Sequence, residues 1–269
     1  MRSPISEHYG SPLVRNTILS YCRGRWVAVT DGRRWLRYAK GRPLTAERAY
    51  PMLLGGFRSV YATASVYRDL SSREILEVPE NQVSFTPFWD IDNEFSAWEC
   101  TIQAAQVLCE RLRSVGIRES VYVVWSGNGA HVRVHEGAMP GRSPLDEAWA
   151  LVTRILGLAS PEMADLASRC PSLKVQNLVK PHALFTAPFS LHRIHDRVAI
   201  PLCPDELEDF RPSWVEPSGF RYCESWQRFR KGEAVEAVRK ALEVHGGYPA
   251  AGRRRRKTRS IEEMLRKFI

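Results

Sequence analysis

Apolar and polar positions follow their clearest pattern between residues 83 and 135. The segment Val83–Ile91 predicts a strand, and residues 98–112 place apolar side chains at the three- and four-residue spacing of a helix. The segments 121–125 and 130–135 then predict two strands, the first buried and the second alternating. The order strand, helix, strand, strand indicates a sheet with helices packed against it.

Further elements are expected on both sides of this region. Two short apolar runs, 26–29 and 35–38, flank Asp31-Gly32 and predict a β-hairpin. Residues 44–70 favour helix in parts, although glycine and proline interrupt them. Two more helices are expected at 145–169 and 233–245, and one more strand at 198–202.

These elements indicate an α/β (α+β) fold, with one domain over residues 1–250 and a tail over residues 251–269. The formal net charge is +9, and residues 253–269 carry eight basic and two acidic side chains, or +6 of that total. Such a tail fits binding to a polyanion, but it also fits a solvated chain end.

Composition excludes several classes of protein. The chain has 269 residues, of which 44% are hydrophobic and 26% charged, so it is neither wholly disordered nor collagen-like. No stretch of about 18 apolar residues is present, so membrane insertion is not expected. The six cysteines form no CxxC pair, so we expect no disulfides, no zinc site and a reduced, intracellular location, cytoplasmic and nucleoid-associated.

Two carboxylates are candidate metal ligands. Asp90 and Asp92 stand two residues apart in the strand-like segment FWDIDNEF. The two-residue period of a strand sends both carboxylates to one face and Ile91 to the other. Two like charges held side by side are stabilised by a cation between them, and carboxylate oxygens suit Mg²⁺ or Mn²⁺. Taken alone, the same pattern also fits a solvated edge or turn.

The segment SGNGAHVRV is a candidate phosphate cradle. Gly127 and Gly129 let the backbone approach a ligand closely, and alternation puts His131 and Arg133 on one face of the following strand. The Ser126 hydroxyl, loop N–H groups, an imidazole and a guanidinium together suit phosphate oxygens. A hairpin with a polar outer face is the alternative.

Together these segments resemble the small catalytic subunit of the archaeal and eukaryotic DNA primases, in the archaeo-eukaryotic primase superfamily. The resemblance covers roughly residues 55–215, with four landmarks in order. The last of them along the chain, Ala187–His192, is also similar to a segment in the primase-like polymerase of bacterial end-joining ligases. The landmarks are Ser59–Leu70, Phe88–Asp92, the Ser126–His131 segment and Ala187–His192.

The resemblance implies a mixed sheet related to the RNA-recognition fold, flanked by helices, with an open cleft. It also implies template-directed nucleotidyl transfer that starts a strand without a primer, using two divalent metals, Mg²⁺ or Mn²⁺. Single-stranded DNA template, nucleoside triphosphates and a large primase subunit would be the partners. By the resemblance, Asp90 and Asp92 would hold the metals, and Ser126, Gly127, His131, Arg133 and His192 would contact the nucleotide.

The sequence departs from the family at two positions. Lys174 stands where the family has a third metal-binding carboxylate, and Thr186 stands where a basic residue is expected. No Asp or Glu lies between residues 165 and 196. An ammonium group beside the two aspartates could act as a built-in cation and exclude one metal, leaving a nucleotide-binding protein with poor catalysis. Alternatively, Lys174 points to solvent and the metals are held without it.

The last eight residues, Glu262–Ile269, resemble the peptide by which replication proteins dock on the sliding clamp. Glu262 takes the position of the usual Gln, and Leu265, Phe268 and Ile269 fill the apolar positions. A short helical turn would insert these three side chains into a pocket of the clamp. An amphipathic helix that folds back on its own core is the alternative.

Three functions therefore remain open. The first is a primase-type nucleotidyltransferase that uses Asp90 and Asp92. The second is a catalytically degenerate paralogue that binds nucleic acid or nucleotide. The third is a repair polymerase that fills gaps at broken ends.

Overall fold

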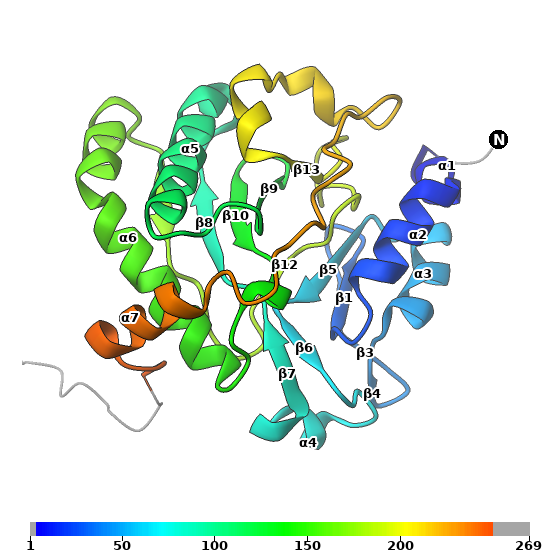
Figure 1. The fold of residues 1–269 in the computed structure, drawn as a ribbon. Helices are drawn as coiled ribbons and strands as arrows, with labels where there is room; N and C mark the ends of the chain where they lie inside the picture. Colours follow the sequence, from blue (N-terminus) through cyan, green and yellow to red (C-terminus); the bar gives the residue numbers. More distant parts are fainter. Residues whose placement is uncertain (1–3, 250–269) are drawn as a thin grey trace, which may run out of the picture.

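The structure is a computed structural model, and it describes residues 4–249. Two sheets form its centre, and helices cover the outer face of each (Figure 1). The basic run at 253–257 and the predicted clamp-docking peptide lie outside the described residues.

The larger sheet has the strand order β11-β8-β10-β9-β13. Helix α5 (Trp98–Ser114) connects β8 to β9, and β10 lies between these two strands and runs antiparallel to both. This arrangement leaves β8 and β9 parallel but never adjacent, so every pairing in the sheet is antiparallel. The sheet flanked by helices that the resemblance implies is present, and all of its strand pairs are antiparallel. The strands are β8 (Phe88–Asp92), β9 (Val121–Trp125), β10 (Ala130–Val134), β11 (Lys174–Gln176) and β13 (Ile200–Leu202).

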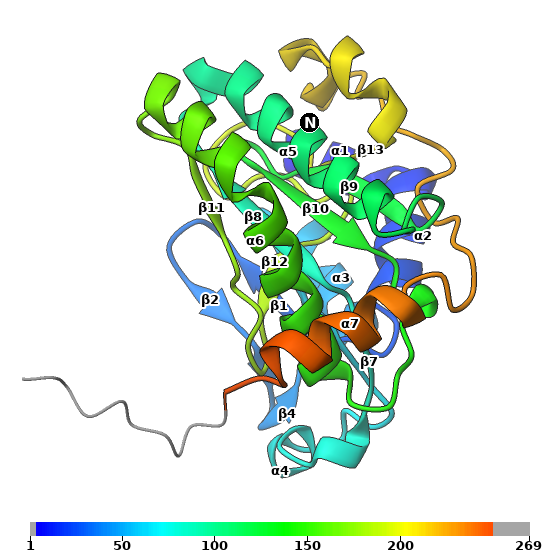
Figure 2. The ribbon, with the colours of Figure 1, turned by 60° about the vertical axis from the view of Figure 1, so that its left-hand side comes forward.

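The two faces of this sheet have different chemistry. Trp89 and Ile91 point toward helices α5 and α6 (Pro144–Arg169), and the Trp89 indole N–H donates to the Val152 carbonyl of α6 at 3.1 Å. Both side chains are almost fully buried, as the core side of a strand requires. Figure 2 shows α5 and α6 side by side across the sheet, with α7 (Val235–His245) crossing over α6. The opposite face carries Asp90 and His131.

The smaller sheet has the strand order β12-β5-β1-β2 and lies against the polar face of the larger one. Phe185 of β12 makes this connection, because its ring lies 5.4 Å from that of Phe88 in β8. Helix α3 packs on β1 and β5, and α1 and α2 pack in turn on α3. The strands are β1 (Val27–Thr30), β2 (Trp35–Leu36), β5 (Ser59–Thr63) and β12 (Leu184–Thr186), and the helices are α1 (Pro4–Gly10), α2 (Pro12–Tyr21) and α3 (Ala46–Leu54).

Short elements complete the fold. Two two-stranded sheets pair β3 with β4 and β6 with β7, and α4 lies close to the second of them (Figure 1). Their bounds are β3 (Tyr38–Ala39), β4 (Arg42–Pro43), β6 (Ser65–Tyr67), β7 (Gln82–Phe85) and α4 (Arg73–Leu76). Five 3-10 turns are η1 (Pro79–Asn81), η2 (Phe95–Ala97), η3 (Glu136–Ala138), η4 (Pro204–Asp209) and η5 (Pro212–Val215).

Most of the predicted elements are confirmed, and three details differ. The expected hairpin forms as β1 and β2, and Gly116 ends α5 with a φ of +94°. Residues 59–67 form strands instead of helix, because their apolar side chains are buried between neighbouring strands. The strand predicted at 83–91 is divided in two before Pro87. Ser96 and Glu99 have the spacing of a capping box, but that box does not form, since Ala97 is the N-cap residue and no side chain caps the helix.

The expectation that disulfides are absent is wrong for four cysteines. Cys100, at the start of α5, is bonded to Cys170, which follows α6, and Cys203 is bonded to Cys223. The partners are 70 and 20 residues apart, so only the packing of the chain brings them together. Cys22 and Cys109 are free and buried. Within residues 4–249, no helix combines the length and the apolar character needed to cross a membrane.

Candidate active site

Asp90 and His131 form the centre of the polar face. They are direct cross-strand partners on β8 and β10, and His131 Nε2 lies 2.8 Å from Asp90 Oδ1. The Asp90 side chain keeps about 20% of its surface exposed and that of His131 about 11%. Alternation predicted only which residues share a face within each strand, and the register of β8 with β10 brings Asp90 and His131 into contact.

Arg133 determines which nitrogen of His131 carries the proton. The Arg133 guanidinium lies 3.0 Å from His131 Nδ1, and a guanidinium only donates hydrogen bonds. Nδ1 is therefore the acceptor, and the proton on Nε2 points at Asp90. Burial lowers the pKa of His131, and the positive charge of Arg133 adds to this, while the hydrogen bond with Asp90 opposes it. The neutral imidazole fits all of these contacts.

Arg133 itself does not face the cleft, contrary to the expectation that it grips a triphosphate. Its side chain is fully buried, and its guanidinium lies 3.8 Å above the ring of Phe185. It also donates to the Tyr21 hydroxyl and to the Thr186 carbonyl, both at 3.0 Å. Alternation along β10 correctly put Arg133 on the face of His131, but the smaller sheet covers this part of that face. Its contacts hold His131 in place.

Lys174 lies across from Asp92. Strand β11 pairs with β8 so that Lys174 is opposite Asp92 and Gln176 is opposite Asp90. Directly opposed residues in an antiparallel pair have Cβ atoms about 5 Å apart, so the Lys174 side chain starts beside Asp92, but among residues 4–249 it forms no ion pair with either aspartate. Asp92 and Lys174 are both exposed. The strand pairing thus brings Lys174 next to Asp92, and whether its ammonium group acts as a built-in cation stays a prediction.

The glycine loop rests on the backbone of β8. Ser126 closes the loop, because its backbone N–H donates to the Gly129 carbonyl at 2.9 Å and its hydroxyl donates to the same oxygen at 3.2 Å. A Cβ atom at Gly129 would lie 2.1 Å from the Ile91 carbonyl oxygen. A glycine is therefore required for this approach. The loop that holds Ser126 and Gly127 is fixed at the Asp92 end of β8.

His192 approaches the loop from the other side. A Cβ atom at Gly127, whose φ is +127°, would lie 2.5 Å from His192 Cδ2. The His192 ring stacks on that of His195 with centroids 4.9 Å apart. Burial, followed by the neighbouring His195 and three arginines, lowers the pKa of His192 to about 4. His192 is therefore neutral near pH 7.

Three arginines that the sequence analysis did not single out surround His192. Arg197 donates to the Asn128 side chain at 2.7 Å and to the Gly127 carbonyl at 3.2 Å, and Arg58 donates to the His192 carbonyl at 2.8 Å. Arg193, the third, also lowers the His192 pKa by its charge. Arg58 directly precedes β5, more than 130 residues before His192, and no local pattern marks it. Together these groups form a cationic end of the site, in which Arg58 also pairs with Asp196.

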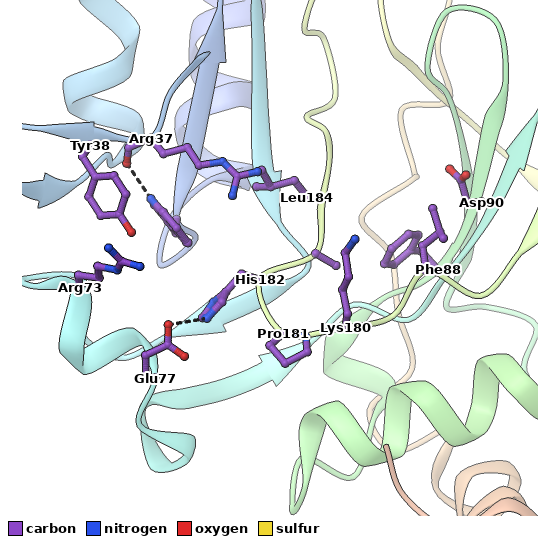
Figure 3. A pocket seen from close by; sticks show the side chains of 13 residues that line it. Arg37, Tyr38, Arg73, Glu77, Phe88, Asp90, Lys180, Pro181, His182 and Leu184 are labelled. Atoms are coloured by element: carbon purple, nitrogen blue, oxygen red, sulfur yellow. Dashed lines mark hydrogen bonds and ion pairs between the residues drawn. The ribbon is translucent and has the colours of Figure 1, made fainter. Parts of the chain in front are cut away.

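A cavity of about 500 Å³ opens from Asp90 in the other direction. Figure 3 shows Asp90 and Phe88 at one end and Arg73 and Glu77 at the other. Segment 178–184 forms one wall, and the region of Trp26, Arg37 and Tyr38 forms the opposite wall. No local sequence pattern indicates this cavity, because its walls come from four separate parts of the chain.

The donor set suits one divalent cation better than two. Asp90, Asp92 and the Gln176 amide oxygen are hard oxygen donors on one face, which suits Mg²⁺ or Mn²⁺. One Asp90 oxygen already accepts a hydrogen bond from His131, and Lys174 adds a positive charge beside Asp92. A second ion next to these groups would be repelled. Among residues 4–249, Cys203, Glu206 and Cys223 also lie within sharing distance of a metal, but the two sulfurs are bonded to each other.

The fold is α+β, with antiparallel sheets flanked by helices, and this is the fold of a known polymerase domain. The chain is similar to the polymerase domain of Mycobacterium tuberculosis Ligase D in complex with DNA, with a TM-score of 0.56 and 15% identity over 90% of this chain and 88% of that one. A second similar structure is the domain of the cyanophage S-2L primase-polymerase, with a TM-score of 0.42 and 14% identity over 74% of this chain and 98% of that one. The second likeness is too low to carry an argument. No protein-family model matches the sequence, and no curated protein matches it either.

Proposed function

We propose that this protein is a nucleotidyltransferase of the primase-polymerase class, which joins nucleotides on a single-stranded DNA template. The observation that carries the proposal is the position of the Asp90–Asp92 pair beside both His131 and the glycine loop, on one polar face. The fold shared with the Ligase D polymerase domain supports the same class. Within this class, the small primase subunit is the assignment that the sequence landmarks favour.

Residues at different positions along β8 would bind the triphosphate and the metal. Ser126 and Gly127 offer a hydroxyl and a tight loop to the triphosphate, with His192 and its arginines beside them. His131 turns its N–H toward Asp90 and fixes the orientation of that carboxylate. Asp90 and Asp92 would hold Mg²⁺ or Mn²⁺, which would activate the attacking 3′ hydroxyl and stabilise the leaving pyrophosphate. Arg133 is a positioning residue for His131.

A second candidate function follows from Lys174. Lys174 pairs with Asp92 across β11 and β8, so its ammonium group can reach the place where a further ion would otherwise be held. A protein with this site could bind nucleotide and nucleic acid without joining nucleotides. Such a degenerate paralogue would keep the fold and the phosphate cradle but would not catalyse nucleotidyl transfer.

The test is incorporation of labelled nucleotides on a single-stranded template, with and without a primer, in Mg²⁺ or Mn²⁺. The incorporation rate of the Asp90→Ala/Asp92→Ala variant should fall at least about 100-fold, because both carboxylates that would hold the metal are lost. Asp165→Ala is the matched control, since Asp165 is an exposed aspartate on α6 that pairs only with Arg169. Equal, minimal incorporation by wild type and double variant would instead support the degenerate paralogue.

The same assay separates the primase from a gap-filling repair polymerase. Synthesis from nucleotides alone supports the primase. Extension that requires a primer and prefers a gap with a 5′-phosphate supports the repair polymerase. A large primase subunit and a sliding clamp, the latter through Leu265, Phe268 and Ile269, stay predictions.

A further inference from the structure

The cavity beside Asp90 lies at the opposite end of β8 from the glycine loop. Phe88 and Asp90, near the start of the strand, line the cavity. Gly129 contacts the backbone at Ile91 and Asp92, near the end of the strand. The cavity and the phosphate cradle are therefore two separate regions that meet at the carboxylate pair.

The cavity is lined by unpaired cations. Arg37, Arg73 and Lys180 are all exposed, and none of them forms an ion pair with any residue in the described range 4–249. Figure 3 shows their side chains distributed along the cavity, from Lys180 near Asp90 to Arg73 at the far end. An elongated anion with charges at intervals would satisfy them better than a compact one.

Aromatic rings lie between these cations. The ring of Trp26 lies 5.2 Å from that of Tyr38 and 5.5 Å from that of His182. The Tyr67 hydroxyl lies 2.7 Å from His182 Nδ1, and the Glu77 carboxylate lies 3.3 Å from His182 Nε2. The backbone of His182 has a φ of +56°, a conformation that a non-glycine residue keeps only when its surroundings hold it. These contacts fix the rings before any ligand arrives.

We propose that this cavity binds a single-stranded segment of nucleic acid and leads it to Asp90. Cations spaced along a groove match successive phosphates, and half-buried rings offer stacking surfaces to unpaired bases. A free triphosphate is less suitable, because the glycine loop and the arginines around His192 already form a compact cationic end elsewhere. The inference rests on the proposed function, since it takes the carboxylate pair as the point where strand and nucleotide meet.

The test measures strand binding without the reaction. Fluorescence anisotropy of a labelled oligothymidylate is recorded in EDTA, without nucleotide, at several salt concentrations. Arg37→Ala/Lys180→Ala should weaken binding about tenfold and reduce the salt slope by about 1.4, because two phosphate contacts are lost from a single strand. Tyr38→Leu should weaken binding by a similar factor through lost stacking while leaving the salt slope unchanged.

The control variant is Arg118→Ala/Lys240→Ala, which removes the same charge from exposed positions that do not line the cavity. Equal weakening by the control and the cavity variant would overturn the inference, since only overall charge would then matter. A second measurement, titration with a fluorescent nucleotide and Mn²⁺, should be unchanged in Arg37→Ala/Lys180→Ala. If nucleotide binding falls instead and strand binding does not, the cavity holds the triphosphate and the inference is wrong.

Failure of this inference and failure of the proposed function give different results. A wild-type protein that binds the strand through the cavity but incorporates no nucleotide would contradict the proposed enzymatic activity and support strand binding in the cavity. If Arg37→Ala/Lys180→Ala incorporates nucleotides and binds strands as well as the wild type does, the enzymatic activity is supported and strand binding in the cavity is contradicted.

Discussion

The Nε2 atom of His131 lies 2.8 Å from Oδ1 of Asp90, and the two residues are direct partners across β8 and β10. Because Arg133 occupies the other nitrogen of the imidazole, the proton on Nε2 is directed at Asp90. One carboxylate oxygen is therefore fixed by the protein, and the other remains for a ligand. The orientation of Asp90 depends on a residue that touches no substrate.

We expect Arg133→Met to raise the pKa of His131. The guanidinium lowers that pKa by its positive charge, so its removal favours the protonated ring. NMR titration of His131 measures the change directly, and a purely structural role for Arg133 would not move it. Tyr21→Phe is the control, because it removes one acceptor of Arg133 and leaves the charge beside His131 in place. An unchanged His131 pKa in Arg133→Met would contradict the positioning role.

Lys174→Asp should increase the number of divalent ions that the site holds. The substitution replaces a positive charge opposite Asp92 with a third carboxylate. Binding of Mn²⁺, followed by electron paramagnetic resonance of the free ion, should rise from one ion per chain to two. Lys240→Asp makes the same charge change on the exposed face of α7 and should leave the stoichiometry unchanged. One ion in both proteins would mean that the Lys174 ammonium group lies away from the carboxylates.

The sequence predicted the part of the site that is local in the chain. Two-residue alternation put Asp90 and Asp92 on one face of their strand and His131 and Arg133 on one face of theirs, and the strand–helix–strand–strand order predicted a sheet with helices against it. The pairing of β8 with β10 comes from the structure. Alternation tells which face a side chain takes, but not what covers that face. Arg133 was therefore expected in the cleft, although the smaller sheet buries it.

Contacts between distant segments could not be predicted in the same way. Arg58 and Lys180 reach the site from elements far from the carboxylates in sequence, and neither lies in a recognisable motif. The cysteine pairs were missed for the same reason, since pairing depends on Cα atoms that meet only after folding. The local pattern favours helix within 59–67, where the structure has strands, because the partners of β5 are not its neighbours in the chain.

Gly129→Ala should destabilise the protein by about 3 kcal/mol and disturb the carboxylate pair. The new Cβ would lie 2.1 Å from the Ile91 carbonyl oxygen, so either the loop or β8 must move. Chemical denaturation measures the loss of stability, and Mn²⁺ binding reports the disturbance. Gly157→Ala is the control, because nothing lies within 4 Å of a Cβ at that position in α6 and alanine favours helix by about 1 kcal/mol. Equal stability of the two variants would contradict the tight fit of the loop on β8.

Acid should destabilise the protein partly through Glu136. Its carboxylate pairs with the buried Arg25 at 2.7 Å and accepts a hydrogen bond from Thr86 at 2.8 Å. Burial raises the pKa of Glu136, but Arg25 outweighs this and lowers it from 4.5 to about 2. A carboxyl group with a lowered pKa contributes stability that is fully present above its unfolded value and is lost as the pH falls toward its folded value. The free energy of unfolding should therefore fall between about pH 4.5 and pH 2.

Glu136→Gln isolates this contribution. The amide leaves Arg25 buried without a counter-charge, so we expect a loss of about 3 kcal/mol at pH 7. Between pH 4.5 and pH 2 the variant should lose less stability than the wild type, since it has no carboxyl group to protonate at this site. Glu243→Gln, which breaks an exposed pair with Arg239 on α7, should cost less than about 1 kcal/mol. Denaturation curves of wild type and Glu136→Gln that run parallel across this pH range would show that the Arg25–Glu136 pair contributes nothing to acid sensitivity.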